Sequence, residues 1–144
     1  MSNGGKIASK RVDDVLVASV RFRDGEIEEY IELLHRCVDC ICGRPFTLYH
    51  KAAKGYDLEV CVPVTRAVET GEIKSRLLEG GVMLSIVHRG PHSTLGEAWE
   101  ALFDHVERNN IAVDGPGREV YLQVCEECTD DSAECVTELQ VPLG

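Results

Sequence analysis

Two predicted helices, each preceded by one strand pattern and followed by two more, organise this sequence. In the strands apolar residues alternate with polar ones, and in the helices they recur at three- and four-residue spacing. The two sets lie about seventy residues apart and repeat the order of elements rather than the residues. Long helices between strand pairs predict the α+β class, built as duplicated βαββ modules with an antiparallel sheet and two long helices.

The first set begins with a valine-rich strand at Val12–Arg23. Its helix starts with a run of glutamates, which the positive end of the helix dipole favours, and carries an apolar stripe over Ile27–Ile41. Gly43 and Pro45 are expected to end this helix. Two strands are predicted to follow, at Phe46–His50 and Leu58–Thr65.

A further strand is predicted at Glu72–Leu78, and the second set then begins with a strand at Val82–His88. Thr94 and Glu97 form a capping-box pattern, in which two side chains accept hydrogen bonds from the free amides at a helix start. The helix that follows carries an apolar stripe that includes Trp99. The last two strands are predicted at Glu119–Cys125 and Val136–Val141.

The chain has 144 residues, which is enough apolar material for one core but not for two independent ones. We expect residues 1–10 to be a disordered leader and residues 11–144 to form the domain, with halves at roughly 11–66 and 72–144. A duplicated unit of this kind leaves a groove along the seam of its halves, and such grooves commonly bind ligands. The sequence therefore predicts a central ligand cleft.

Acidic residues outnumber basic ones, with 25 Asp and Glu against 15 Lys and Arg and a formal net charge of −10. Nucleic acid and anionic membranes are not expected as partners, because both require a basic face. No apolar run reaches the ~20 residues that cross a bilayer, and the N-terminus lacks the apolar segment of a secretory signal. We expect a cytoplasmic protein that is a monomer or weak dimer and whose field favours cationic ligands.

The predicted strand at Glu119–Cys125 carries the strongest candidate site. Alternation places Val120 and Leu122 on a core face, and Glu119 with Tyr121 on the other face. If this second face lines a cleft, Glu119 is a sequestered acid that either binds a cation or takes part in proton transfer. The alternative is a solvated face on which Glu119 is an ordinary surface acid.

Aromatic side chains supply candidate ligand platforms. Trp99, the only tryptophan, shares the second helix with Phe103, and a large ring can stack on a planar molecule and attract a cation. Tyr49 is expected to point into the cleft while Phe46 packs in the core, and Tyr30 fits either place. The alternative for the helical rings is ordinary core packing.

Cysteine and histidine patterns give further alternatives. The C-x-x-C pairs at Cys37–Cys40 and Cys125–Cys128 have the spacing of zinc ligands, but nothing local shows that they meet, so reduced thiols are favoured. An odd total of seven cysteines without an export signal argues against a disulfide framework. His88 and His92 lack an evident third ligand, and we interpret their segment as a strand end and a turn. No metal and no cofactor is expected.

Four segments in order carry a family resemblance over nearly the whole chain, from about Val12 to Leu143. They are the tyrosine strand Phe46–His50, the strand Asp57–Val64, the segment His88–Pro91 leading into the Trp99 helix, and Glu119–Tyr121 with the ending Thr137–Pro142. With these segments the sequence resembles the GyrI-like family, also called the AraC-type effector-binding domain. We expect a stand-alone member, since the chain has no room for a helix-turn-helix.

The resemblance implies a duplicated βαββ fold whose central cleft binds amphipathic, often cationic aromatic compounds. It implies that Glu119 faces the ligand deep in the cleft and that Trp99 and Tyr121 sandwich the ligand. Other stand-alone members look like hydrolases of cyclopropane-bearing genotoxic compounds that use a glutamate and a tyrosine, and Glu119 and Tyr121 occupy the matching positions. The many cysteines of this chain depart from the common pattern.

Three functions follow from these expectations. The leading hypothesis is a multidrug-binding or sequestering protein with a ligand site formed by Glu119, Tyr121, Trp99, Tyr49, Phe103 and Tyr30. The second is a hydrolase that uses Glu119 and Tyr121 as catalytic residues in the same cleft. The third is an acidic protein that inhibits a DNA-handling enzyme by docking on its basic surface.

Overall fold

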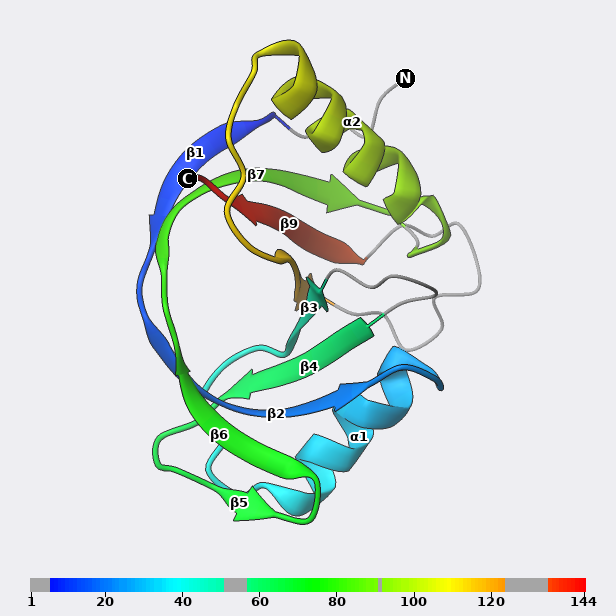
Figure 1. Cartoon of the computed structure of the whole chain (residues 1–144). Helices are drawn as coiled ribbons and strands as arrows, with labels where there is room; N and C mark the ends of the chain where they lie inside the picture. Colours follow the sequence, from blue (N-terminus) through cyan, green and yellow to red (C-terminus); the bar gives the residue numbers. More distant parts are fainter. Residues whose placement is uncertain (1–5, 51–56, 91, 124–134) are drawn as a thin grey trace. The chain divides into compact units, whose positions relative to one another are not determined.

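Antiparallel strands and two helices make up the computed structural model, which describes residues 6–50, 57–90, 92–123 and 135–144 (Figure 1). The fold class is therefore α+β, as the sequence predicts. The chain divides into two compact units, Val12–Gly81 and Met1–Arg11 with Val82–Gly144. We name them the α1 unit and the α2 unit after the helix in each. Neither helix is long and apolar enough to span a bilayer in the part of the chain that the structure describes.

In its described residues the α1 unit has the sheet order β5-β6-β2-β4-β3. Within it β4 pairs antiparallel with β2 on one side and β3 on the other, so that Val60 lies opposite both Val20 and Thr47. Directly opposite residues share a sheet face, and this is the face that α1 covers. The elements are β2 (Val15–Phe22), α1 (Ile27–Cys37), β3 (Phe46–His50), β4 (Asp57–Pro63), β5 (Glu69–Thr70) and β6 (Ile73–Leu78).

The described part of the α2 unit has the sheet order β1-β7-β9-β8. Its central strand, β9, pairs antiparallel with both β7 and β8. A short 3-10 turn, η1, leads from the sheet into α2. The elements are β1 (Ala8–Val12), β7 (Gly81–Arg89), η1 (His92–Thr94), α2 (Leu95–Arg108), β8 (Gly117–Gln123) and β9 (Val136–Pro142).

Strand β1 differs from the sequence expectation, which placed its first residues in a disordered leader. Two contacts tie it to the α2 unit: Ser85 Oγ donates to the Ala8 carbonyl at 3.4 Å, and Lys10 Nζ lies 3.0 Å from Oε2 of Glu138. The segment lacks an alternating apolar pattern, so periodicity does not predict a strand there. Its pairing comes from the neighbouring sheet edge rather than from its own side chains.

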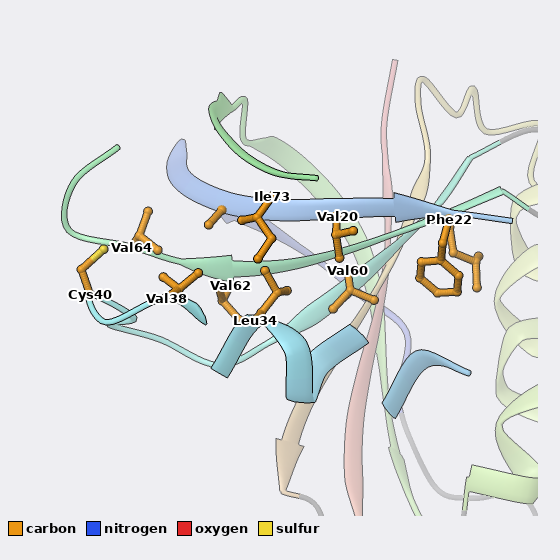
Figure 2. Packing of buried hydrophobic residues seen from close by; sticks show 11 residues of the cluster. Val20, Phe22, Leu34, Val38, Cys40, Val60, Val62, Val64 and Ile73 are labelled. Atoms are coloured by element: carbon orange, nitrogen blue, oxygen red, sulfur yellow. The ribbon is translucent and has the colours of Figure 1, made fainter. Parts of the chain in front are cut away.

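The α1 unit buries an aliphatic core between α1 and its sheet (Figure 2). A capping box fixes the helix start, with the Glu29 side chain accepting from the Glu26 backbone amide at 2.8 Å. Leu34 is fully buried and packs with Val20, Val60 and further apolar residues of the sheet. Because burying one such side chain contributes about 1.5–3 kcal/mol, this core holds α1 in place.

Helix α1 ends at Cys37, earlier than the predicted end near Ile41. From there the chain pairs with the end of β4: the Cys42 amide donates to the Pro63 carbonyl at 2.8 Å, and the Thr65 amide donates to the Cys40 carbonyl at 3.0 Å. These tertiary hydrogen bonds outweigh the helical spacing of the apolar residues, which instead reach the core from extended backbone.

The start of α2 also differs from the prediction. Thr94 makes no side-chain cap, and its Oγ1 shares a hydrogen bond of 2.9 Å with Nε2 of buried His88. The expected capping box with Glu97 is therefore wrong. The hydroxyl has a partner on β7 instead, and this bond fixes the start of α2 to the sheet.

An ionic cluster around the buried Glu59 lies on the sheet face of the α1 unit that α1 does not cover. Glu59 accepts hydrogen bonds from Ser19 Oγ at 2.6 Å, His50 Nε2 at 2.8 Å and Arg76 Nη2 at 2.7 Å. Burial opposes ionisation of this carboxyl group, but the hydrogen bonds from Arg76, Ser19 and His50 outweigh it and lower the pKa of Glu59 to about 2. The sequence analysis did not single out this cluster.

Acid should destabilise the protein in a pH window set partly by Glu59. Its folded-state pKa of about 2 lies below the ordinary value of 4.5. The stabilisation is therefore complete above pH 4.5 and is lost as the pH falls toward 2. Glu59→Gln should lower the free energy of unfolding by about 2 kcal/mol at neutral pH and should flatten part of this dependence.

Urea denaturation at several pH values measures both effects. The control variant is Glu32→Gln, which changes an acid whose side chain is 82% exposed. A pH profile of Glu59→Gln that matches the wild type would contradict the role assigned to Glu59.

Candidate functional site

The strand register of the α2 unit places Glu119 beneath α2. Glu119 lies opposite Leu139 of β9, which in turn lies opposite Ile86 of β7. Leu139 and Ile86 pack in one core cluster with Leu102 of α2. Because opposite residues share a sheet face, Glu119 lies on the face that α2 covers.

A second row lies next to the first on the same face. Tyr121 lies opposite Thr137, and Thr137 lies opposite His88. His88 and Thr137 are fully buried, and Tyr121 is buried as well. The hydrogen bond between His88 and Thr94 places this row at the start of α2. The described residues under this part of the helix are therefore more polar than the aliphatic core beside them.

Glu119 is buried, with 4% of its surface exposed, and both of its carboxylate oxygens accept hydrogen bonds. Tyr121 Oη donates to Oε1 at 2.8 Å, and Trp99 Nε1 donates to Oε2 at 3.2 Å. The alternative that Glu119 is an ordinary surface acid is wrong. Instead the carboxylate lies between an indole N–H and a phenol O–H, two neutral groups from different elements.

Trp99 connects this buried carboxylate to the outer surface of α2. Its six-membered ring rests on Gly117 at the start of β8, where an added Cβ would come within 3.0 Å of the indole. On the outer side the indole stacks on Phe103, with ring centroids 5.6 Å apart and planes 17° apart. Phe103 is 50% exposed. The two rings therefore form a platform that runs from Glu119 to the solvent.

An open hollow of about 710 Å³ lies over this platform on α2. Four carboxylate side chains border it at helical spacing, and Glu119 is not among its lining residues. Asp104 forms an ion pair of 2.9 Å with Arg108. The hollow thus combines exposed aromatic surface with negative charge; it is lined by Trp99, Phe103, Glu97, Glu100, Asp104 and Glu107.

The sequence analysis placed Glu119 and Tyr121 on one face of β8, as the structure does, but it expected the opposite face to be the core. Val120 and Leu122, expected in the core, are only partly buried, whereas Glu119 and Tyr121 lie under α2. The reason is chemical: a tryptophan on the helix and a tyrosine on the strand supply donors for the carboxylate, so a polar face can be buried. Periodicity alone contains no information about such donors.

Tyr30 and Tyr49 belong to the α1 unit and pack against the core beneath α1. The Tyr30 ring stacks on Phe22, with centroids 3.8 Å apart, and its hydroxyl donates to the Asp24 carbonyl at 3.0 Å. Phe46 is buried, as expected. A ligand-binding role for Tyr30 and Tyr49 stays a prediction.

The described residues give no support to a metal site at the cysteine pairs or at His88 and His92. Cys37 and Cys42 are exposed free thiols, and Cys40 is a buried one. Cys125–Cys128 and the His92 side chain lie outside the described residues. Within the part that is described, no three His, Cys, Asp or Glu side chains come together as a metal site would require.

Residues 44–143 match the GyrI-like small molecule binding domain. The chain belongs to this family. The prediction of a GyrI-like domain is thus confirmed, and the chain is a small-molecule binding domain. A search of the curated proteins gives no significant match.

Two solved structures of EcmrR resemble this GyrI-like domain in sequence and in fold. The C-terminal domain of EcmrR is 26% identical, with a TM-score of 0.82 over 98% of both chains. The EcmrR chain in a DNA complex is 27% identical, also with a TM-score of 0.82, and this chain, matched over 96% of its length, covers 57% of it.

Two more distant structures share the fold alone. A hydrolase encoded by lin2189 from Listeria innocua is 14% identical, with a TM-score of 0.70 over 96% of this chain and 92% of that one. SAV2435 bound to tetraphenylphosphonium is 11% identical, with a TM-score of 0.64 over 96% of this chain and 94% of that one.

Removing the Tyr121 hydroxyl should destabilise the protein, because it leaves one oxygen of a buried carboxylate without its donor. Tyr121→Phe is expected to lower the free energy of unfolding by about 2 kcal/mol, the usual range for a hydrogen bond to a charged group. Urea denaturation measures the loss. Tyr30→Phe, which removes a bond to a carbonyl at the surface, should cost less than 1 kcal/mol. Equal losses in the two variants would contradict the importance of the Tyr121–Glu119 bond.

Proposed function

We propose that this domain binds amphipathic organic cations with aromatic rings, and that Glu119, Trp99 and Tyr121 form the centre of the binding site. The observation that carries the proposal is the buried Glu119 carboxylate, which contacts an aromatic side chain through each oxygen. The chain is a small-molecule binding domain, so the open question is what kind of molecule fits these side chains.

The chemistry of the three side chains favours a positive charge with flat apolar surface around it. A carboxylate away from bulk water attracts a cation more strongly than one at the surface, because the local dielectric constant is lower. The faces of tryptophan and tyrosine rings attract cations as well, by roughly 0.5–2 kcal/mol each. Apolar contact adds about 25 cal/mol per Å² of buried surface, which supplies affinity without dictating one shape.

The hollow over α2 supports the same ligand class from the solvent side. Glu97, Glu100, Asp104 and Glu107 recur every three or four residues and therefore share a helix face. Like charges at this spacing repel each other by about 0.2–0.5 kcal/mol per pair, and a bound cation would relieve this repulsion. The exposed Phe103 ring offers the adjoining apolar surface.

A protein of the same fold adds support. SAV2435 is described as bound to tetraphenylphosphonium, which is a positive ion surrounded by phenyl rings. The fold can therefore hold such an ion, and in this chain Glu119 and the two rings beside it are the groups that would do so.

Neutralising Glu119 should weaken cation binding. We expect Glu119→Gln to raise the Kd for tetraphenylphosphonium at least tenfold, because the amide keeps the shape of the side chain but not its charge. Isothermal titration or tryptophan fluorescence measures the Kd, and a thermal melt confirms that the variant is folded.

The matched control is Glu138→Gln. Glu138 is also a buried glutamate of the α2 unit, but it neighbours Leu139 on β9 and so lies on the opposite sheet face, where Lys10 and Gln140 bind it. Glu138→Gln should leave the Kd for tetraphenylphosphonium within about twofold of the wild-type value. Equal Kd values for wild type and Glu119→Gln would remove Glu119 from the mechanism.

A second candidate, hydrolysis in the same site, is favoured by the hydrogen bond from Tyr121 to Glu119. Glu119 would act as a general base on a water molecule, and Tyr121 would orient or protonate the reacting group. Incubation with an electrophilic cyclopropane compound separates the two functions. Product formation that disappears in both Glu119→Gln and Tyr121→Phe would support the enzyme, whereas stoichiometric binding without product would support the binding protein.

A further inference from the structure

We infer that Thr137 is a further ligand-binding residue, and that it makes the site prefer cations that carry N–H groups over fully substituted ones. The inference rests on the proposed function, which places the cation at Glu119. It adds a residue from a different strand and narrows the ligand class to protonated amines and related N–H donors.

The first observation is that the Thr137 hydroxyl has no hydrogen-bond partner within the part of the chain that the structure describes, although the side chain is 0% exposed. A buried hydroxyl in this state costs roughly 1–3 kcal/mol relative to a bonded one. Buried side-chain polar groups are therefore almost always satisfied. The lack of a hydrogen bond to the Thr137 hydroxyl is explained if the ligand supplies the donor.

The second observation is where Thr137 lies. It is the cross-strand neighbour of Tyr121 on one side and of His88 on the other, on the face beneath α2. Tyr121 in turn donates to Glu119. Opposite residues on paired strands have Cβ atoms about 5 Å apart, and diagonal ones about 7–8 Å. Thr137 and Glu119 are thus close enough to contact one ligand head group together.

The chemistry of this pair defines the ligand. The Glu119 carboxylate can only accept hydrogen bonds, and the Thr137 oxygen can accept one as well. A protonated amine offers N–H donors to both and also brings the positive charge. A quaternary ammonium or phosphonium ion brings the charge alone, so it donates no hydrogen bond to the Thr137 hydroxyl.

A buried water molecule is the competing occupant, because water satisfies isolated hydroxyls in many proteins. The two explanations differ in what happens when the hydroxyl is removed. If a ligand is the partner, removal of the hydroxyl should stabilise the ligand-free protein and reduce the affinity for N–H cations. If a water is the partner, removal of the hydroxyl should destabilise the protein or leave its stability unchanged, and the preference between the two kinds of cation should not change.

The test uses Thr137→Val, which replaces the hydroxyl with a methyl group of similar size, and a matched pair of probes. The probes are 1-naphthylmethylammonium and its N,N,N-trimethyl derivative, which share a ring and a charge but differ in N–H donors. Wild type should bind the first about tenfold more tightly, equivalent to about 1.4 kcal/mol for one charge-assisted hydrogen bond. Thr137→Val should abolish this preference, leave binding of the trimethyl probe unchanged and raise the Tm.

The control variant is Thr47→Val. Thr47 is another fully buried threonine on the helix-covered face of its sheet, but it lies in the α1 unit and already has an interaction partner. This variant should keep the probe preference and should not raise the Tm.

The outcomes separate this inference from the proposed function. A wild-type protein that binds tetraphenylphosphonium but shows no preference within the matched pair would overturn the role of Thr137 and leave the proposed function standing. A preference that persists in Thr137→Val, or a lower Tm in that variant with an unchanged preference, would also overturn it. Failure of the wild type to bind any of the three cations would end both proposals.

Discussion

The arrangement beneath α2 depends on one carboxylate, that of Glu119, being held between an indole N–H and a phenol O–H. One hydrogen bond comes from Tyr121, on the same strand as Glu119, and the other comes from Trp99 and connects β8 to α2. They allow an acidic residue to be buried on the sheet face beneath α2, next to Leu139 and Ile86. The position of Trp99 against β8, and with it the aromatic surface on α2, follows from this arrangement.

The two units treat a buried glutamate in different ways. In the α1 unit Glu59 is surrounded by a guanidinium group, an imidazole and a hydroxyl, and its pKa is lowered to about 2. Such a carboxylate already has a cationic partner and serves as a structural tie between strands. In the α2 unit Glu119 accepts hydrogen bonds from two neutral aromatic side chains, the indole of Trp99 and the phenol of Tyr121. The same residue type is thus bound mainly by charged and polar groups in one unit and contacts aromatic groups in the other, where we propose that it binds a ligand.

Sequence periodicity predicted the α+β class, both helices and the strands at Phe46–His50 and Val136–Val141 well, because each has a regular apolar pattern. It failed where a contact from elsewhere in the chain decided the outcome. Thr94 bonded to His88 rather than capping its own helix, and β1 formed against a sheet edge. The shared strand face of Glu119 and Tyr121 was predicted from their spacing, but the burial of this face was not, since it involves Trp99 from another element.

The chain contains a single tryptophan, and its N–H is bonded to Glu119. Indole emission depends on hydrogen bonding and on nearby rings, and all tryptophan emission of this chain comes from an indole that is bonded to Glu119. The intrinsic fluorescence therefore reports on the surroundings of Glu119, which is the proposed binding site. A molecule that displaces Trp99 or stacks on it should change the emission spectrum. The change can be measured without a dye or label, and no second tryptophan contributes to it.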